Sequence, residues 1–163
     1  MKDQGSFLYR TEIEWTGERR GRLRSSNLPS LDVCAPPEFQ GQDGLWTPEH
    51  LYVASVNACF MTTFLTIAAN SKMDVASFSA SAEGKLEKIE GGGFRITEIV
   101  LKPRIVLRAA RDLDRARRIL EKAERNCFIT GSIKTVVKVD PQIYHEQSPA
   151  YPCPAVPGSV TPG

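Results

Sequence analysis

The order of the expected elements predicts an α+β fold. Two short strand-like runs come first, and a long apolar helix follows; a hairpin of two longer strands then leads to an amphipathic helix and a last strand. Strands that are grouped, rather than alternating with helices, are typical of α+β domains. We therefore expect antiparallel sheets packed on one long, buried central helix. The chain of 163 residues is long enough for one such domain.

The first elements predict a basic hairpin. Residues 7–15 and the stretch around Leu23 to Val33 have the composition of short strands, and the polar turn TGERRG at residues 16–21 separates them. The basic residues in and beside this turn are Arg19, Arg20, Arg22 and Arg24. A solvated basic hairpin is the simpler interpretation. The functional alternative is that one arginine turns inward and holds an anion.

A strong start signal precedes the long helix. Thr47 is the expected N-cap, Pro48 takes the first helical position and Glu49 lies in the first turn. From Leu51 to Ala69 the apolar residues fall on almost every face, which predicts a helix buried nearly all round. Polar residues interrupt this stretch, and no signal peptide is recognised, so we expect a soluble cytoplasmic protein without a membrane segment.

The second half predicts a hairpin, a helix and a strand. Residues 74–89 and 94–107 are strand-like runs joined by the turn EGGG, and Pro103 predicts an edge position or a bulge. Asp112 is the expected N-cap of the second helix, and residues 132–140 form the last expected strand. The apolar face of this second helix contains Leu113, Ala116, Leu120, Ala123 and Cys127.

Composition limits the domain and its partners. Six of the 11 prolines lie in residues 141–163, where no apolar periodicity is found. We expect one domain over residues 1–140 and an irregular proline-rich tail over residues 141–163. The chain has 21 Lys and Arg against 19 Asp and Glu, a net charge of +2. This balance favours neither nucleic acid nor an acidic membrane as a partner.

The cysteines are candidate thiols rather than metal ligands. Their spacing has no C-x-x-C pair and no nearby histidine, so structural zinc is not expected. The four are Cys34, Cys59, Cys127 and Cys153. Free cysteine often packs inertly, and for Cys59 alone this alternative stays open. A reactive thiolate in an apolar helix needs a nearby cation, because burial raises the pKa of a thiol.

The arginine turn and Glu49 have the chemistry to supply such a cation and its partner carboxylate, although Glu49 also suits an ordinary first turn. Ten positions along a helix give a rise of about 15 Å and leave Glu49 and Cys59 about 80° apart in azimuth. Either a long arginine spans part of this gap, the helix is interrupted, or Glu49 serves the thiol of a second chain. We expect a site at a dimer interface. Cys127 ends a helix, where the dipole disfavours an anion, which suits a resolving thiol.

Four segments together resemble the family of osmotically inducible protein C and the organic hydroperoxide resistance proteins. They are TGERRG, TPEHL, NACF and AERNCFI, and the resemblance runs from about Phe7 to Asp140. The combination of PEHL, a cysteine ten positions on and a second cysteine at a helix end is specific, whereas no single segment is. One departure is Phe128, because related peroxidases usually have proline after the second cysteine.

The resemblance implies an α+β fold in an intertwined homodimer with shared active sites. It also implies a cysteine-based peroxidase, without metal or organic cofactor, that reduces organic hydroperoxides or hydrogen peroxide. Carried over, Cys59 attacks the peroxide, Cys127 resolves the sulfenic acid as a disulfide, and an external dithiol reduces that disulfide. Arg19 matches the arginine that stabilises the thiolate, and Glu49 matches its partner carboxylate.

An alternative function is a non-catalytic dimer of the same fold that binds a lipid-like or other small molecule, with incidental cysteines. Three aromatic side chains are candidates for lining a pocket that takes an alkyl chain: Phe60, Phe64 and Phe128. Core packing is the simpler interpretation for at least two of them. The state of the cysteines after treatment with a hydroperoxide separates the two functions.

Overall fold

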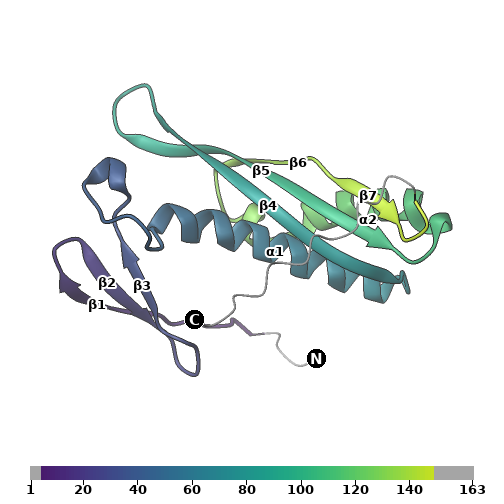
Figure 1. The fold of residues 1–163 in the computed structure, drawn as a ribbon, viewed down its shortest axis with the longest axis horizontal. Helices are drawn as coiled ribbons and strands as arrows, with labels where there is room; N and C mark the ends of the chain where they lie inside the picture. The colour runs from purple at the N-terminus through teal and green to yellow at the C-terminus, as the bar shows by residue number, and fades with distance from the viewer. Residues whose placement is uncertain (1–4, 149–163) are drawn as a thin grey trace, which may run out of the picture. The chain divides into compact units, whose positions relative to one another are not determined.

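The computed structural model describes residues 5–148, and the chain separates into two compact units, Met1–Ala54 and Ser55–Gly163 (Figure 1). The boundary between the two units falls inside the helix Pro48–Asn70. The single domain expected over residues 1–140 stays a prediction. Cys153 and the rest of the chain from residue 149 lie outside the described residues.

The first unit contains a three-stranded antiparallel sheet in the order β1-β2-β3. The strands are β1 (Glu12–Gly17), β2 (Arg20–Arg24) and β3 (Leu31–Cys34). The strand expected at residues 7–15 begins later, and the stretch expected around Leu23 to Val33 divides into parts of β2 and β3. Gly17 pairs with Arg20, so only Glu18 and Arg19 form the tip of the first hairpin. Gly17, with φ 115°, takes a conformation that favours glycine.

One face of this first sheet exposes large apolar side chains. Ile13 and Trp15 are two residues apart on β1 and so lie on the same face, and they are 67% and 76% exposed. Ile13 pairs with Leu23 of β2. Within the single chain, this face of the sheet is largely uncovered.

A compact loop connects β3 to the long helix. It contains the short helix η1 (Pro37–Phe39), and its ends are joined by a hydrogen bond from the Cys34 N–H to the Trp46 carbonyl, 2.9 Å long. Gly41 is required here, because a Cβ at this position would lie 1.5 Å from the Ala35 carbonyl oxygen. The loop therefore leads the chain directly to Thr47.

The long helix α1 (Pro48–Asn70) begins where the sequence predicts. The Thr47 hydroxyl accepts a hydrogen bond from the His50 N–H at 3.3 Å, which confirms the N-cap. The prediction that this helix is buried nearly all round is wrong for the single chain. Its buried residues form one stripe, four residues apart: Val56, Phe60, Phe64 and Ala68. The other apolar residues of α1 are at least partly exposed, because only one face of the helix is covered.

By length and composition, the described helix Pro48–Asn70 would be able to cross a membrane, and 22% of its most apolar window is buried. Its threonines satisfy their hydroxyl groups inside the helix. Thr62 donates to the Ala58 carbonyl at 3.1 Å, and Thr66 donates to the Thr62 carbonyl at 2.8 Å. Such hydrogen bonds let polar residues occupy an apolar helix.

The second unit contains a mixed sheet. The long strands β4 (Val75–Lys88) and β5 (Phe94–Leu107) form the predicted antiparallel hairpin, and β6 (Val136–Val139) and β7 (Gln142–His145) pair with β5 in parallel. The expected antiparallel pairing is present in both sheets, and the parallel pairing of β6 and β7 with β5 adds to it. The strand β7 also extends regular structure past the expected boundary at residue 140, into the segment expected to be irregular.

Pro103 lies in the middle strand of this sheet, not at an edge, and it is buried. Proline lacks the N–H that a ladder needs. On the side of β5 that faces β6 and β7, residues 98–101 pair with β6 and residues 104–107 pair with β7. Pro103 falls in the gap between these two ladders, which explains why a central strand accepts it.

The second helix and a short third helix follow the hairpin. After η2 (Ala110–Asp112), α2 spans Leu113–Asn126 and α3 spans Phe128–Gly131. Asp112 is the N-cap residue as predicted, but its side chain makes no capping hydrogen bond and contacts Arg115 at 3.3 Å instead. The buried face of α2 and its end contains Ala116, Ile119, Leu120, Ala123 and Cys127.

In the core of the second unit, α1 packs on the hairpin of β4 and β5, and Figure 1 shows the helix lying along these strands. Phe64 and Phe78 of β4 have ring centroids 5.5 Å apart. The Asn57 side-chain amide donates to the Ala80 carbonyl at 3.2 Å. These contacts fix the position of α1 on β4, and with it the position of Cys59.

Candidate active site

The structure brings Cys59 and Cys127 together. Cys59 lies on α1, half-buried, next to the fully buried Phe60. Cys127 lies at the junction of α2 and α3, 2% exposed. Both thiols are free, and they are close enough to hydrogen bond to each other. Two sulfur atoms 68 residues apart in the sequence thus form one pair.

Hydrogen bonds to the Cys59 sulfur favour its thiolate. Burial raises the pKa of Cys59, but four donors outweigh burial and hold the pKa below the usual cysteine value. The donors are the backbone N–H of Ile129, the Cys127 thiol, the Thr63 hydroxyl and the backbone N–H of Phe128. Thr63 is four residues after Cys59 and therefore lies on the same side of α1.

Cys127 is held in the opposite state. Burial is the largest cause that raises the pKa of Cys127, and the neighbouring Cys59 raises it further through its hydrogen bond and its charge. Hydrogen bonds from Thr130 act in the other direction but do not outweigh these effects. Cys59 therefore ionises first. Cys127 stays protonated, and its S–H donates a hydrogen bond to the Cys59 sulfur. Burial and the neighbouring Cys59 together raise the pKa of Cys127 and keep it protonated.

Arg19 lies at the tip of the first hairpin and is exposed. Its guanidinium donates to the Phe39 carbonyl at 3.0 Å and to Gln40 Oε1 at 3.1 Å, so it binds the loop after β3. Its own carbonyl accepts from the Ala35 N–H at 3.2 Å. Arg19 is thus tied to the loop through its backbone as well as its side chain.

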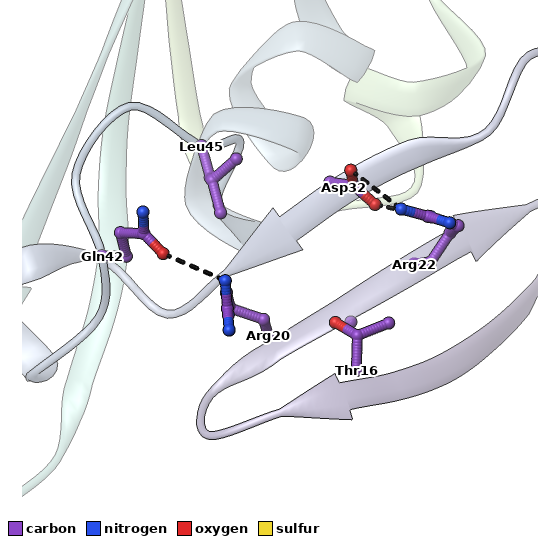
Figure 2. A pocket seen from close by; sticks show the side chains of 7 residues that line it. Thr16, Arg20, Arg22, Asp32, Gln42 and Leu45 are labelled. Atoms are coloured by element: carbon purple, nitrogen blue, oxygen red, sulfur yellow. Dashed lines mark hydrogen bonds and ion pairs between the residues drawn. The ribbon is translucent and has the colours of Figure 1, made fainter.

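The other arginines of the hairpin have different partners. Arg22 pairs with Asp32 at 2.7 Å, and Arg24 pairs with Glu14 at 3.1 Å, both on the surface. Figure 2 shows Arg20 and the Arg22–Asp32 pair in a cavity of about 250 Å³, where Arg20 reaches Gln42 Oε1 at 3.4 Å. Surface pairs of this kind hold Arg22 and Arg24 on the sheet. Of the four arginines in and beside the hairpin turn, Arg19 and Arg20 have no ion pair with a carboxylate of the described residues.

Glu49 lies in the first turn of α1, and its Oε2 is buried without a hydrogen-bond partner. A buried carboxylate oxygen without a partner is costly, so this position favours a cationic partner. In the described residues no ion pair joins Glu49 to Arg19. The helix between Glu49 and Cys59 is continuous, which removes the alternative of an interrupted helix.

The remaining candidates divide into core and surface. Phe60 and Phe64 are 1% and 0% exposed and belong to the core, whereas Phe128 is 84% exposed. Cys34 is buried at the end of β3, where its sulfur accepts a hydrogen bond from the Gln42 N–H at 3.2 Å. In residues 5–148 no group of three or more His, Cys, Asp or Glu side chains is arranged to hold a metal ion.

Sequence reasoning missed the other groups that touch the Cys59 sulfur: Thr63 and the N–H groups of Phe128 and Ile129. The spacing of four residues was a signal for Thr63. For the N–H group of residue 128 the signal was Phe128 itself, because a proline at this position would have no N–H to donate. An ionisable thiol beside a protonated thiol on an α+β fold has the chemistry that thiol–disulfide exchange needs.

Comparison with known proteins gives the family. The family model of OsmC-like proteins matches residues 41–142, and the chain belongs to this family. No curated protein sequence matches it. Solved structures show the same fold. An OsmC-like protein of unknown function from Vibrio cholerae has a TM-score of 0.77 at 24% identity, with 83% of this chain and 99% of that chain covered.

Two organic hydroperoxide resistance proteins are also similar to the chain. The protein from Elizabethkingia anophelis has a TM-score of 0.70 at 23% identity, over 87% of this chain and 99% of its own. The protein from Legionella pneumophila has a TM-score of 0.69 at 23% identity, over 86% and 99%. At this identity the likeness establishes the fold, and family membership suggests a function related to peroxides.

Proposed function

We propose that the protein is a cysteine-based peroxidase that reduces organic hydroperoxides or hydrogen peroxide through Cys59 and Cys127. The observation that carries this proposal is the pair itself, one thiol poised to ionise and a neighbour held protonated. The names of two similar structures, both organic hydroperoxide resistance proteins, support the choice of substrate. We also propose a cytoplasmic location, which is compatible with the solubility typical of OsmC-like proteins.

The reaction has three steps. The Cys59 thiolate attacks the distal oxygen of the hydroperoxide, the O–O bond breaks, and the alkoxide leaves and takes a proton to become an alcohol. The Cys127 thiol then condenses with the Cys59 sulfenic acid, which forms a disulfide and releases water. An external dithiol reduces the disulfide and is itself oxidised to a disulfide.

The intact mass of the chain after one equivalent of cumene hydroperoxide tests this function. Loss of two hydrogen atoms, with a disulfide mapped between Cys59 and Cys127, supports the peroxidase. Unchanged thiols would refute it and would favour the non-catalytic binding protein instead. Bond formation is a direct readout, because it requires both the oxidant and the predicted pair.

For Arg19 and Glu49 we propose the roles that the resemblance implies. Arg19 stabilises the thiolate and the departing oxygen, and Glu49 orients its guanidinium. The buried, unpartnered oxygen of Glu49 supports this assignment, because an arginine would satisfy it. In this arrangement Arg19 exchanges its present partners, Phe39 and Gln40, for the carboxylate.

Arg19→Ala is expected to slow the reaction of the reduced protein with cumene hydroperoxide by about 100-fold, the usual effect of removing one transition-state donor. Arg22→Ala is the matched control, because Arg22 lies on the same hairpin but pairs with Asp32. The control is expected to stay within about twofold. Rapid-mixing kinetics with a single equivalent of peroxide measures both. Equal rates for Arg19→Ala and Arg22→Ala would remove Arg19 from the site.

We also propose a homodimer with shared active sites. The single chain leaves uncovered the apolar face of β1 and much of the apolar surface of α1, including Met61, which is 36% exposed. A second copy of the chain would bury such surfaces. In such a dimer, Glu49 of one chain can act on Cys59 of the second chain, which it cannot reach along its own helix.

Sedimentation is expected to give twice the mass of one chain at micromolar concentration. Ile13→Glu is expected to weaken the dimer by about tenfold or more, because it places a charge in the apolar interface. Glu12→Gln is the control, since adjacent residues of a strand point to opposite faces. A wild-type monomer with full peroxidase activity would refute the shared site.

A further inference from the structure

One face of the first sheet carries charged side chains. Arg22 of β2 lies opposite Glu14 of β1 and Asp32 of β3, so the three side chains share a face. Arg20 and Arg24 lie two residues to either side of Arg22 on the same strand, which places them on this face as well. The exposed apolar side chains of β1 alternate with Glu14 and therefore lie on the opposite face.

Arg20 is the arginine of this face that no carboxylate neutralises in the part of the chain that the structure describes. The other two arginines pair with Asp32 and Glu14. Arg20 Nη1 reaches Gln42 Oε1 at 3.4 Å, which is long for a hydrogen bond, and Arg20 Nε is buried without a hydrogen-bond partner. A buried donor of a charged group is costly when it has no acceptor. The position therefore favours an acceptor from outside the chain.

The cavity beside Arg20 has room for such an acceptor. Its volume is about 250 Å³, and pockets for drug-sized ligands have about 300–1,000 Å³, so it suits a smaller molecule. Besides the Arg22–Asp32 pair, the lining includes a hydroxyl, from Thr16, and an apolar side chain, from Leu45 (Figure 2).

The charges that line the cavity favour an anion with one negative charge. The pKa of Asp32 lies below its usual value, first because of its hydrogen bond with Arg22 and then because of the charges of Arg22 and Arg20. Asp32 is therefore ionised near neutral pH and neutralises Arg22. Two guanidinium groups and one carboxylate leave one net positive charge, that of Arg20.

We propose that this cavity is a binding site for a small carboxylate, held by the Arg20 guanidinium. The two oxygens of a carboxylate match two parallel N–H donors, and Arg20 Nε and Nη2 form such a fork. The Thr16 hydroxyl is a further donor, and Leu45 is the apolar contact for a short alkyl chain. The site goes beyond the proposed peroxidase and does not rest on it, because none of the residues that line it acts in the proposed thiol reaction.

Titration of the full-length chain with sodium butyrate at constant ionic strength tests the site, with the backbone amide NMR signals of Gln42 and Leu45 as the readout. We expect shifts that saturate, with half-saturation at about 1 mM, which is within the range for a ligand of this size. Butyramide has a similar shape without the charge and is expected not to bind. Inorganic phosphate, which is largely a dianion at pH 7.5, is expected to bind more weakly. Shifts that do not saturate with butyrate, equal binding of butyramide, or tighter binding of phosphate would each overturn the proposal.

Two substitutions locate the site. Arg20→Gln is expected to weaken butyrate binding by about tenfold or more, because charge-assisted hydrogen bonds are lost. Arg24→Gln is the matched control, since Arg24 lies on the same face of β2 but pairs with Glu14 and does not line the cavity. The control is expected to stay within about twofold. Equal losses in both variants would mean that general surface charge attracts the anion, and would overturn the proposal.

A third variant keeps the arginine and fills the cavity. Leu45→Trp is expected to weaken butyrate binding by about tenfold, because the larger side chain occupies the space of the ligand. Unchanged binding in Leu45→Trp would overturn the proposal. None of these titrations uses peroxide, so their outcome and that of the disulfide test with cumene hydroperoxide are decided separately.

Discussion

Cys59→Ser is expected to abolish the first turnover of hydroperoxide. A serine hydroxyl does not ionise near neutral pH, so the four donors around position 59 would have no anion to stabilise. Loss of the attacking group should reduce the rate by about 1000-fold or more. Rapid mixing of the reduced variant with one equivalent of cumene hydroperoxide, and measurement of the remaining peroxide, gives this rate.

Cys127→Ser is the matched control for this prediction. It keeps the attacking thiol, and its hydroxyl is still a hydrogen-bond donor, so the first turnover is expected to proceed. The reaction then stops at a sulfenic acid on Cys59, which dimedone traps and tryptic mapping locates. If Cys127→Ser lost the first turnover and Cys59→Ser kept it, the roles of the two thiols would be reversed.

Phe64→Ala is expected to have the largest effect on stability. The side chain of Phe64 is 0% exposed and packs against Phe78 with ring centroids 5.5 Å apart. Truncation of a buried phenylalanine lowers the free energy of unfolding by about 3–5 kcal/mol, because it loses apolar burial and leaves a cavity. Urea denaturation at a fixed protein concentration measures the change.

Phe128→Ala is the control for stability, because Phe128 is 84% exposed. Its substitution is expected to change the free energy of unfolding by less than about 0.5 kcal/mol. A comparable loss in both variants would mean that Phe64 does not occupy the core of the second unit. A loss smaller than about 1 kcal/mol for Phe64→Ala would contradict the packing of α1 on β4.

Elements with strong local signals could be predicted from the sequence. The N-cap Thr47 with Pro48 sets the start of α1, and the glycine-rich turn between β4 and β5 sets the hairpin, where Gly91, Gly92 and Gly93 all have positive φ. These signals depend on a few adjacent residues. Tertiary contacts change such elements little.

Elements that depend on distant partners could not be predicted. Pro103 suggests an edge strand when β5 is considered alone, and its central position makes sense only once β6 and β7 pair with β5 at separate segments. The exposure of α1 is similar, since an apolar residue shows that a surface needs burial but not which chain supplies it. Both features are properties of pairing between distant segments.

The candidate site divides in the same way. Cys59 and Cys127 carry distinctive chemistry, so their sequence context already made them candidates for the site. The N–H groups that contact Cys59 belong to the backbone, which every residue except proline provides, so their role appears only when the turn after Cys127 is placed against α1. Arg19 lies at the tip of the first hairpin and bonds to the loop after β3, whereas Arg22 lies within β2 and pairs with Asp32. The position of each arginine on the hairpin therefore decides its partner.

The central claim is that the thiolate with the lowered pKa is the group that attacks the peroxide. The most direct measurement compares two pH profiles on one sample: the rate of the first peroxide turnover and the site-resolved alkylation of Cys59. We predict that both profiles rise with the same midpoint, below the usual cysteine value. A turnover rate that does not change with pH across the ionisation of Cys59 would contradict the claim.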